Sequence, residues 1–234
     1  MIREYLRRNV HEGEPGFRWR GKEITRLEGF SDAVFAFAVT LLVVSLEVPR
    51  TFPELMRTMR GFIPFAICFV LLINIWSQHC RFFRRYGLQD STVRMLNSVL
   101  LFFVLFYVYP LKFLFVTVFD NEGRLGALEM RELFIVYGLG SAALQAIFCL
   151  LYLRAIAYRL ALDLTPFELL STRETLFHHV VTGMVCIVSV LAALLLPLNL
   201  VAIAGYLYLV LVPYFWISKR LFKRRKQALV GQGR

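Results

Sequence analysis

The first strongly hydrophobic run of the chain reads Thr25-Arg-Leu-Glu-Gly-Phe-Ser-Asp-Ala-Val-Phe-Ala-Phe-Ala-Val-Thr-Leu-Leu-Val-Val-Ser-Leu-Glu-Val-Pro49. As a helix rising about 1.5 Å per residue, it is long enough to cross a bilayer core of roughly 30 Å. Yet it carries an acid, Asp32, near its start and a hydroxyl, Thr40, near its middle. An acid inside a membrane costs free energy, so Asp32 indicates either a partner on another helix or a function.

The composition of the whole chain is that of a membrane protein. Of its 234 residues, 58% are hydrophobic, and the mean hydropathy is +0.61. We predict an all-α membrane protein, because a segment in lipid must satisfy its own backbone hydrogen bonds. Six spans are predicted, at residues 27–48, 61–79, 95–119, 130–153, 174–196 and 198–217.

Capping boxes predict where several helices begin. In this pattern a Ser or Thr and a Glu three residues later each accept a hydrogen bond from the other's backbone N–H. The pairs are Thr25–Glu28, Thr51–Glu54, Thr165–Glu168 and Ser171–Glu174. The first pair commits Ser31 and Asp32 to the second turn of the first helix. Asp163 and Glu168 are expected to be solvated, because they fall in the link before the fifth span.

Basic residues predict the orientation in the membrane. Four segments on one side of a six-span chain hold 21 of the 27 Lys and Arg residues, namely 1–29, 80–94, 154–173 and 218–234. Because Lys and Arg accumulate in cytoplasmic loops, we predict a multi-pass protein with both termini in the cytoplasm. The chain thus divides into a basic cytoplasmic tail at 1–25, a six-helix transmembrane domain at 26–217 and a polybasic cytoplasmic tail at 218–234.

The net charge of +11 needs no nucleic-acid partner, because the basic tails are explained as anchors attracted to anionic lipid headgroups. The sequence contains no Walker motif, no glycine-rich phosphate loop, no G-x-S-x-G and no C-x-x-C pair. We therefore predict no enzyme chemistry, no metal site and no cofactor. Lys112, in the third span, is expected to extend its ammonium outward to the membrane interface.

Asp32 needs a partner from another helix. Glu28, four residues earlier on the same helix, would repel it. Trp76 and His79 end the second span on the same predicted side of the membrane and are the candidates. A cluster of Ser31, Asp32 and His79 would also be explained by a purely structural role in joining two helices.

A second pattern concerns one face of the first span. Phe37, Leu41 and Val44 recur at i, i+4 and i+7, with Thr40 at the edge of their stripe. One interpretation is a buried helix whose hydroxyls bond to carbonyls of their own helix. The other is a pore-lining helix, in which apolar rings exclude water and hydroxyl oxygens meet a passing cation. The pattern alone leaves both open.

The run Arg26-x-x-x-Phe30-Ser31-Asp32, with the apolar residues after it, resembles the first span of bacterial relatives of the endolysosomal (transmembrane protein 175-type) potassium channel. The likeness is carried by residues 26–49 and by the Trp76-x-x-His79 pair. That family lacks a T-V-G-Y-G filter, and this sequence contains none. The resemblance implies an all-helical cation channel in a bacterial plasma membrane, a homotetramer whose four first helices line one central pore.

The same resemblance implies roles for individual residues. Phe37 would form the hydrophobic constriction, Leu41 and Val44 would form further apolar rings, and Thr40 would select potassium. Phe37 is larger than the Ile or Leu that the family usually has there. The network that holds the pore helix in place would consist of Arg26, Phe30, Ser31, Asp32, Trp76 and His79.

We therefore predict passive, leak-type, potassium-selective permeation, with K+ as the only ligand. The alternative is a proton-coupled secondary transporter in which Asp32 and His79 relay protons. A transporter would show saturable, pH-coupled uptake, whereas a channel would give ohmic current.

Overall fold

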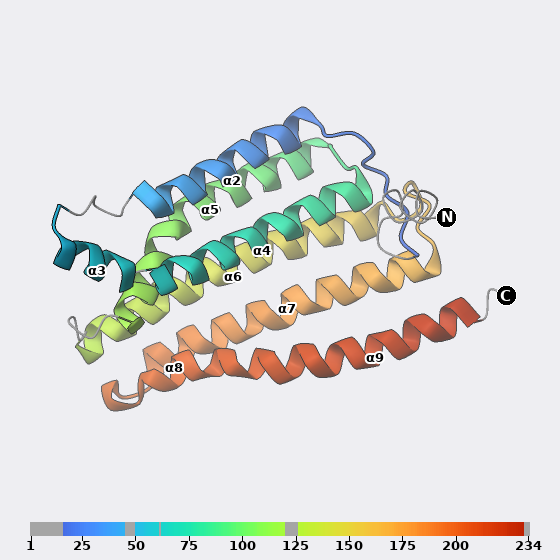
Figure 1. Cartoon of the computed structure of the whole chain (residues 1–234). Helices are drawn as coiled ribbons and strands as arrows, with labels where there is room; N and C mark the ends of the chain where they lie inside the picture. The colour runs from blue at the N-terminus through green and yellow to red at the C-terminus, as the bar shows by residue number, and fades with distance from the viewer. Residues whose placement is uncertain (1–15, 45–49, 61, 120–125, 232–234) are drawn as a thin grey trace, which may run out of the picture.

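The computed structural model of the chain describes residues 16–44, 50–60, 62–119 and 126–231. Within these ranges the regular structure is helical and contains no strand (Figure 1). The α-helices are α2 (Arg26–Val44), α3 (Phe52–Arg60), α4 (Phe62–Tyr86), α5 (Ser91–Phe119), α6 (Ala127–Ala157), α7 (Pro166–Leu195), α8 (Ala202–Tyr206) and α9 (Leu211–Gly231). The 3-10 turns η1 (Leu198–Leu200) and η2 (Leu207–Val210) flank α8.

Five stretches of helix among the described residues are long and apolar enough to cross a membrane, namely Phe62–Tyr86, Ser91–Phe113, Ala127–Ala157, Pro166–Leu195 and Leu198–Phe222. They correspond to the second to sixth predicted spans. The third, fourth and fifth begin at 91, 127 and 166, earlier than the predicted 95, 130 and 174. The first predicted span, 27–48, corresponds to α2. Its residues 45–48 lie outside the described part of the chain.

Two of the predicted capping boxes close as expected. The backbone N–H of Glu28 donates to Thr25 Oγ1 at 3.2 Å, and that of Thr25 donates to Glu28 Oε2 at 3.0 Å. In the second box, the Glu168 N–H donates to Thr165 Oγ1 at 3.2 Å and the Thr165 N–H donates to Glu168 Oε2 at 2.9 Å. These boxes fix the starts of α2 and α7, and the first of them places Ser31 and Asp32 inside α2.

The Ser171–Glu174 pair was a wrong prediction of a helix start. Helix α7 already begins at Pro166, so Ser171 lies within the helix. The reason is local, because Thr165 is an N-cap residue followed directly by a proline, whose fixed φ suits the first helical position.

Glu168 is fully buried, so the prediction that it is solvated is also wrong. Its carboxylate lies 2.9 Å from the Arg20 guanidinium and 3.5 Å from that of Arg18. The hydrogen bond with Glu168 is the main reason why the pKa of the Arg18 guanidinium is raised above its ordinary value. Asp163, in contrast, is exposed, and its carboxylate lies 3.2 Å from the Arg18 guanidinium.

The long helices lie alongside one another, and consecutive ones run in opposite directions (Figure 1). Helix α2 packs against α4 and α5, and α6 packs along α7. One end of the bundle, which we call the proximal end, contains the start of α2, the end of α4, the link between α6 and α7, and the end of α9. Helices α3 and α8 lie at the distal end.

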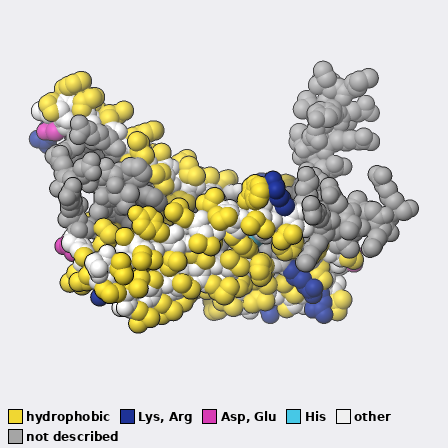
Figure 2. All heavy atoms as spheres, turned by 90° about the horizontal axis from the view of Figure 1, so that it is seen from below, with side chains coloured by type: hydrophobic (Ala, Val, Ile, Leu, Met, Phe, Trp, Pro, Cys, Tyr) yellow, Lys and Arg dark blue, Asp and Glu magenta, His cyan; other side chains and the backbone are white. Residues whose placement is uncertain are grey.

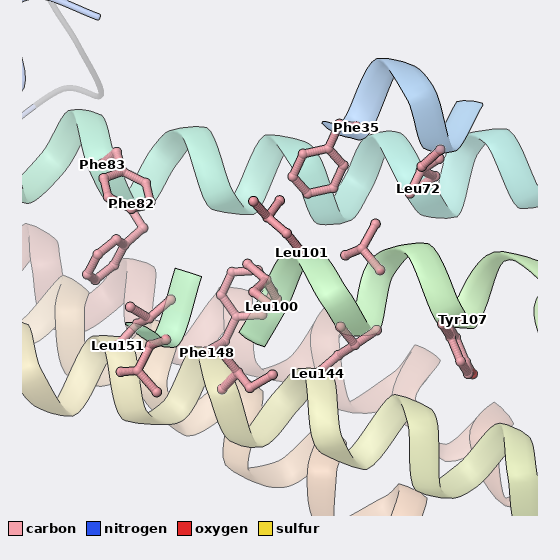
Figure 3. Close-up of a cluster of buried hydrophobic side chains, with 14 of the residues drawn as sticks. Phe35, Leu72, Phe82, Phe83, Leu100, Leu101, Tyr107, Leu144, Phe148 and Leu151 are labelled. Carbon is pink, nitrogen blue, oxygen red and sulfur yellow. The ribbon is translucent and has the colours of Figure 1, made fainter. Parts of the chain in front are cut away.

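A hydrophobic core joins the first four long helices (Figure 3). Its labelled members come from α2, α4, α5 and α6: Phe35, Leu72, Phe82, Phe83, Leu100, Leu101, Tyr107, Leu144, Phe148 and Leu151. The ring of Tyr107 occupies space that only a glycine leaves open, because a Cβ at Gly140 would lie 2.4 Å from that ring. Helix α2 contributes to this core from one side only.

The outer surface is largely apolar. Figure 2 shows one face on which hydrophobic side chains cover most of the length, while Lys and Arg lie toward the ends. Large side chains such as Phe102 and Phe106 on α5 and Trp216 on α9 are exposed. A soluble monomer rarely exposes so extensive an apolar surface, whereas lipid or neighbouring subunits would cover it.

Candidate pore helix and its anchoring network

Helix α2 has two faces that differ in burial although both are rich in apolar residues. One face is buried in the core and consists of Ser31, Phe35, Ala38 and Leu42. The opposite face is exposed and consists of Phe30, Ala33, Phe37 and Thr40. Each set repeats at intervals of three and four residues, as expected for one side of a helix. The exposed face is therefore available to another molecule.

Two of the residues predicted to line a pore lie together on the exposed face. The Phe37 side chain is 56% exposed, and Thr40 follows it after three residues. Leu41, one turn after Phe37, is half-buried and packs partly against the core. The backbone of Val44 ends α2, but its side chain lies outside the described part of the chain.

The hydroxyl of Thr40 is hydrogen-bonded within its own helix. It donates to the backbone carbonyl of Ala36 at 3.0 Å. A hydroxyl has one proton and two lone pairs, so this bond uses the proton and leaves the oxygen able to accept. Thr40 thus combines both features that the sequence left as alternatives, namely a bond to its own helix and an exposed oxygen.

Asp32 is bound to α4 through an indole. Trp76 Nε1–H donates to Asp32 Oδ1 at 2.7 Å, and Cys80 Sγ lies 4.0 Å from the same oxygen. Hydrogen bonds to an ionised carboxylate are stronger than neutral ones. Of the two partners expected for Asp32, Trp76 is therefore the one that binds it.

Ser31 and His79 are joined by an amide that the sequence analysis missed. Asn97 of α5 donates from Nδ2 to Ser31 Oγ at 2.9 Å, and its Oδ1 lies 2.7 Å from His79 Nε2. Ser31 in turn donates to the carbonyl of Leu27 at 2.8 Å. Ser31, His79 and Asn97 are all buried. This chain of hydrogen bonds connects α2, α5 and α4 inside an apolar bundle.

Only one feature of the sequence could have indicated the role of Asn97. It is an amide near the start of a long apolar run, but one polar residue does not reveal which side of its helix faces the bundle. His79 lies among aromatic rings, with centroids 5.6 Å from Phe35 and 4.7 Å from Phe83. The neighbouring rings are apolar, and the polar partner of His79 Nε2 is the side-chain amide of Asn97.

The remaining members of the predicted network lie apart from these hydrogen bonds. Arg26 is exposed at the first residue of α2, and Phe30 is exposed on the same face as Phe37. Asp32 and His79 do not share a hydrogen bond, because each is bonded to a different neighbour. The proton relay of the alternative transporter therefore lacks a direct hydrogen bond between these two residues.

Lys112 of α5 reaches helix α2 near the distal end of that helix. Its Nζ lies 3.4 Å from the backbone carbonyl of Leu42, so the ammonium of α5 reaches the wall of α2. A cavity of about 290 Å³ at the proximal end lies beside the network. It is lined by aromatic and charged residues of both signs, including Trp19, Glu28, Asp32 and Arg84.

Comparison with known proteins extends these observations. The matching family model is described as the endosomal/lysosomal potassium channel TMEM175 and covers residues 26–119, which include α2 and every candidate residue above. A potassium channel of Marivirga tractuosa is 38% identical over an alignment of 233 positions, which covers 92% of this chain and 94% of that protein. The chain belongs to the TMEM175 family.

Solved TMEM175 structures share this architecture. A crystal structure of the potassium channel MtTMEM175, a threonine-to-alanine variant in complex with a nanobody–MBP fusion, matches with a TM-score of 0.80 at 38% identity. The match covers 91% of this chain and 99% of that one. A lysosomal potassium-selective channel TMEM175 homologue from Chamaesiphon minutus matches in fold with a TM-score of 0.57 at 22% identity, over 86% and 96% of the two chains.

Membership of the TMEM175 family decides two of the predictions. The chain is a multi-pass membrane protein, as its apolar helices indicate. TMEM175 proteins are ion channels rather than enzymes, which confirms the prediction that the chain is not an enzyme.

Proposed function

We propose that four copies of this chain form a potassium-selective channel whose pore is lined by α2. The observation that carries this proposal is the placement of Phe37 and Thr40 on a face of α2 that the chain itself leaves exposed. The opposite face is fixed to α4 and α5 by hydrogen bonds. Relatives named as potassium channels support the choice of ion.

In this channel, Phe37 is the gate. Four phenyl rings around a narrow axis exclude water and therefore ions, and a small displacement of the helices wets the pore. Leu41 and Val44 continue the apolar wall beyond it. Arg26, Phe30 and the Asp32–Trp76 pair belong to the network that sets the position of the pore helix.

Thr40 is the selectivity residue. Its oxygen keeps lone pairs free after donating to Ala36, so four such oxygens would replace part of the hydration shell of a K+ ion. With one short ring and no T-V-G-Y-G filter in the sequence, we expect a modest preference for K+ over Na+.

The channel lies in the plasma membrane of a bacterium with both termini in the cytoplasm. In this orientation the proximal end faces the cytoplasm. The tails at 1–25 and 218–234 carry basic residues toward anionic lipid headgroups, and residues 26–217 form the six-helix channel domain.

Electrical recording tests the proposal. The purified full-length protein is placed in planar bilayers between KCl and NaCl solutions, with protein-free bilayers as the control. We expect ohmic current whose reversal potential shows K+ to be more permeant than Na+. Saturable, pH-coupled uptake without such a current would contradict the channel and indicate a proton-coupled transporter.

A further inference from the structure

Residues 17–21 form a strap that crosses the proximal end of the bundle before α2 begins. Phe17 is buried, and its ring meets that of Tyr86 edge-on with centroids 5.8 Å apart. The guanidinium of Arg85 lies 4.6 Å from the centre of the Phe17 ring. The strap thus begins with an aromatic anchor in the end of α4.

The middle of the strap is bound to the backbone of α4. The amides of Arg20 and Gly21 both donate to the carbonyl of Arg84 at 3.1 Å. A Cβ on Gly21 would lie 2.6 Å from the carbonyl oxygen of Phe83, so only a glycine permits this approach. These contacts fix the strap by its main chain.

Glu168 holds the strap from the other side. Its carboxylate accepts hydrogen bonds from the Arg18 amide at 2.8 Å and from the Arg20 guanidinium at 2.9 and 3.2 Å. The Arg20 Nε also donates to the carbonyl of Leu162 at 2.8 Å. A fully buried carboxylate requires such partners, and removing them is strongly unfavourable. The strap therefore joins the end of α4 to the start of α7.

This anchor acts on α2 because the two are close in the chain. Only four residues, 22–25, separate Gly21 from the first residue of α2. An extended chain spans at most about 3.5 Å per residue, so the first residue of α2 stays within about 18 Å of Gly21 in the strap. Any movement of α2 that exceeds the slack of this short connection must break the strap.

We propose that Arg20 and Glu168 are positioning residues for the pore helix, whose pairing restrains the proximal end of α2 and thereby limits how often the pore opens. This inference rests on the proposed channel function. The pair lies at the proximal end of the bundle, away from the Phe37 and Thr40 face, so it sets the frequency of opening and leaves the choice of ion unchanged.

The test replaces Glu168 by glutamine. In Glu168→Gln the amide oxygen still accepts from the Thr165 N–H, which preserves the start of α7, while the negative charge that binds Arg20 is lost. We expect K+ flux from liposomes to rise about threefold or more, within the range of mutations that alter coupling between sites. The permeability ratio of K+ to Na+ should equal that of the wild type.

The matched control is Asp163→Asn, the same change of acid to amide in the same region. Asp163 contacts Arg18 but is exposed, and the hydrogen bond it accepts from Arg20 goes to its backbone carbonyl, which the substitution keeps. We expect its flux to match the wild type. Hydrogen exchange of the peptide containing residues 16–25 should accelerate in Glu168→Gln and stay unchanged in Asp163→Asn.

A double-mutant cycle tests whether the pair acts as one unit. Arg20→Gln should raise flux as Glu168→Gln does, and the combined variant should add nothing further. Arg20→Lys keeps the charge and should restore most of the wild-type restraint. If Glu168→Gln does not assemble, Arg20→Gln alone provides the same comparison.

The outcomes separate the two proposals. Unchanged flux in both Glu168→Gln and Arg20→Gln, or a changed K+/Na+ ratio in either, would overturn the inference while leaving the channel in place. A wild-type protein that conducts no K+ would overturn the channel function itself and the inference with it.

Discussion

Phe37 presents a large apolar ring on the outside of the chain, and in the proposed tetramer a neighbouring copy would meet this ring. If the ring is the gate, then shortening it widens the constriction and admits water. We expect Phe37→Ala to raise K+ flux from liposomes on the order of tenfold, equivalent to about 1.4 kcal/mol of barrier. Phe37→Leu should give an intermediate value. A flux from Phe37→Ala no greater than that of the wild type would rule out this gate.

Thr40 tests selectivity at the same scale. Thr40→Val keeps the shape of the side chain and removes the oxygen, whereas Thr40→Ser keeps the hydroxyl. We expect Thr40→Val to lower the K+/Na+ permeability ratio about fivefold, as the loss of about 1 kcal/mol of polar interaction would produce. Thr40→Ser should retain the wild-type ratio. The reversal potential under bi-ionic conditions measures both, and equal ratios in all three proteins would exclude Thr40 from the filter.

At the scale of the helices, buried polar groups decide how α2 is seated. Asn97 binds Ser31 and His79 at once, so its loss removes the donor to Ser31 Oγ and leaves the buried His79 Nε2 without its partner. Each buried group left unsatisfied costs about 1–3 kcal/mol. We expect Asn97→Ala to lower the thermal unfolding midpoint in detergent by several degrees.

The control for Asn97 is another amide in the bundle. Asn74 is exposed on α4, and its side chain accepts a hydrogen bond from Gln78 of its own helix. Asn74→Ala should leave the midpoint near that of the wild type. Equal shifts in the two variants would show that Asn97 has no special role in seating α2.

Local patterns predicted these elements better than long-range ones. Thr25 and Glu28 placed the start of α2 correctly, because a capping box involves neighbours in the chain. Asn97 was missed because burial depends on which side of α5 meets the other helices. Glu168 was misjudged for a similar reason, since its partners Arg18 and Arg20 come from about 150 residues earlier in the sequence.

At the scale of the whole molecule, the proposed tetramer brings four copies of the exposed face of α2 together. A cysteine on this face would lie near its counterpart in a neighbouring subunit, within reach of a disulfide. We expect Phe37→Cys to form disulfide-linked dimers on mild oxidation, visible on a non-reducing gel. Ala38→Cys should not, because Ala38 is buried within its own subunit.

The four native cysteines are free and set the background of this experiment, so the wild type is oxidised in parallel. Dimers that form equally in the two variants and the wild type would contradict the proposed arrangement.

The sequence predicted the membrane class and the family from a short motif in α2. It did not reveal the strap, because no local pattern indicates that residues 17–21 pack against α4 and α7.

The bond from Thr40 to Ala36 has a further consequence for charge discrimination. The sole proton of the hydroxyl is already committed to a carbonyl one turn away. A chloride ion arriving at this ring would find electron pairs and no donor, whereas a cation would find ligands that need no reorientation. In the proposed tetramer, this bond to the helix backbone would therefore make the Thr40 ring favour positive ions.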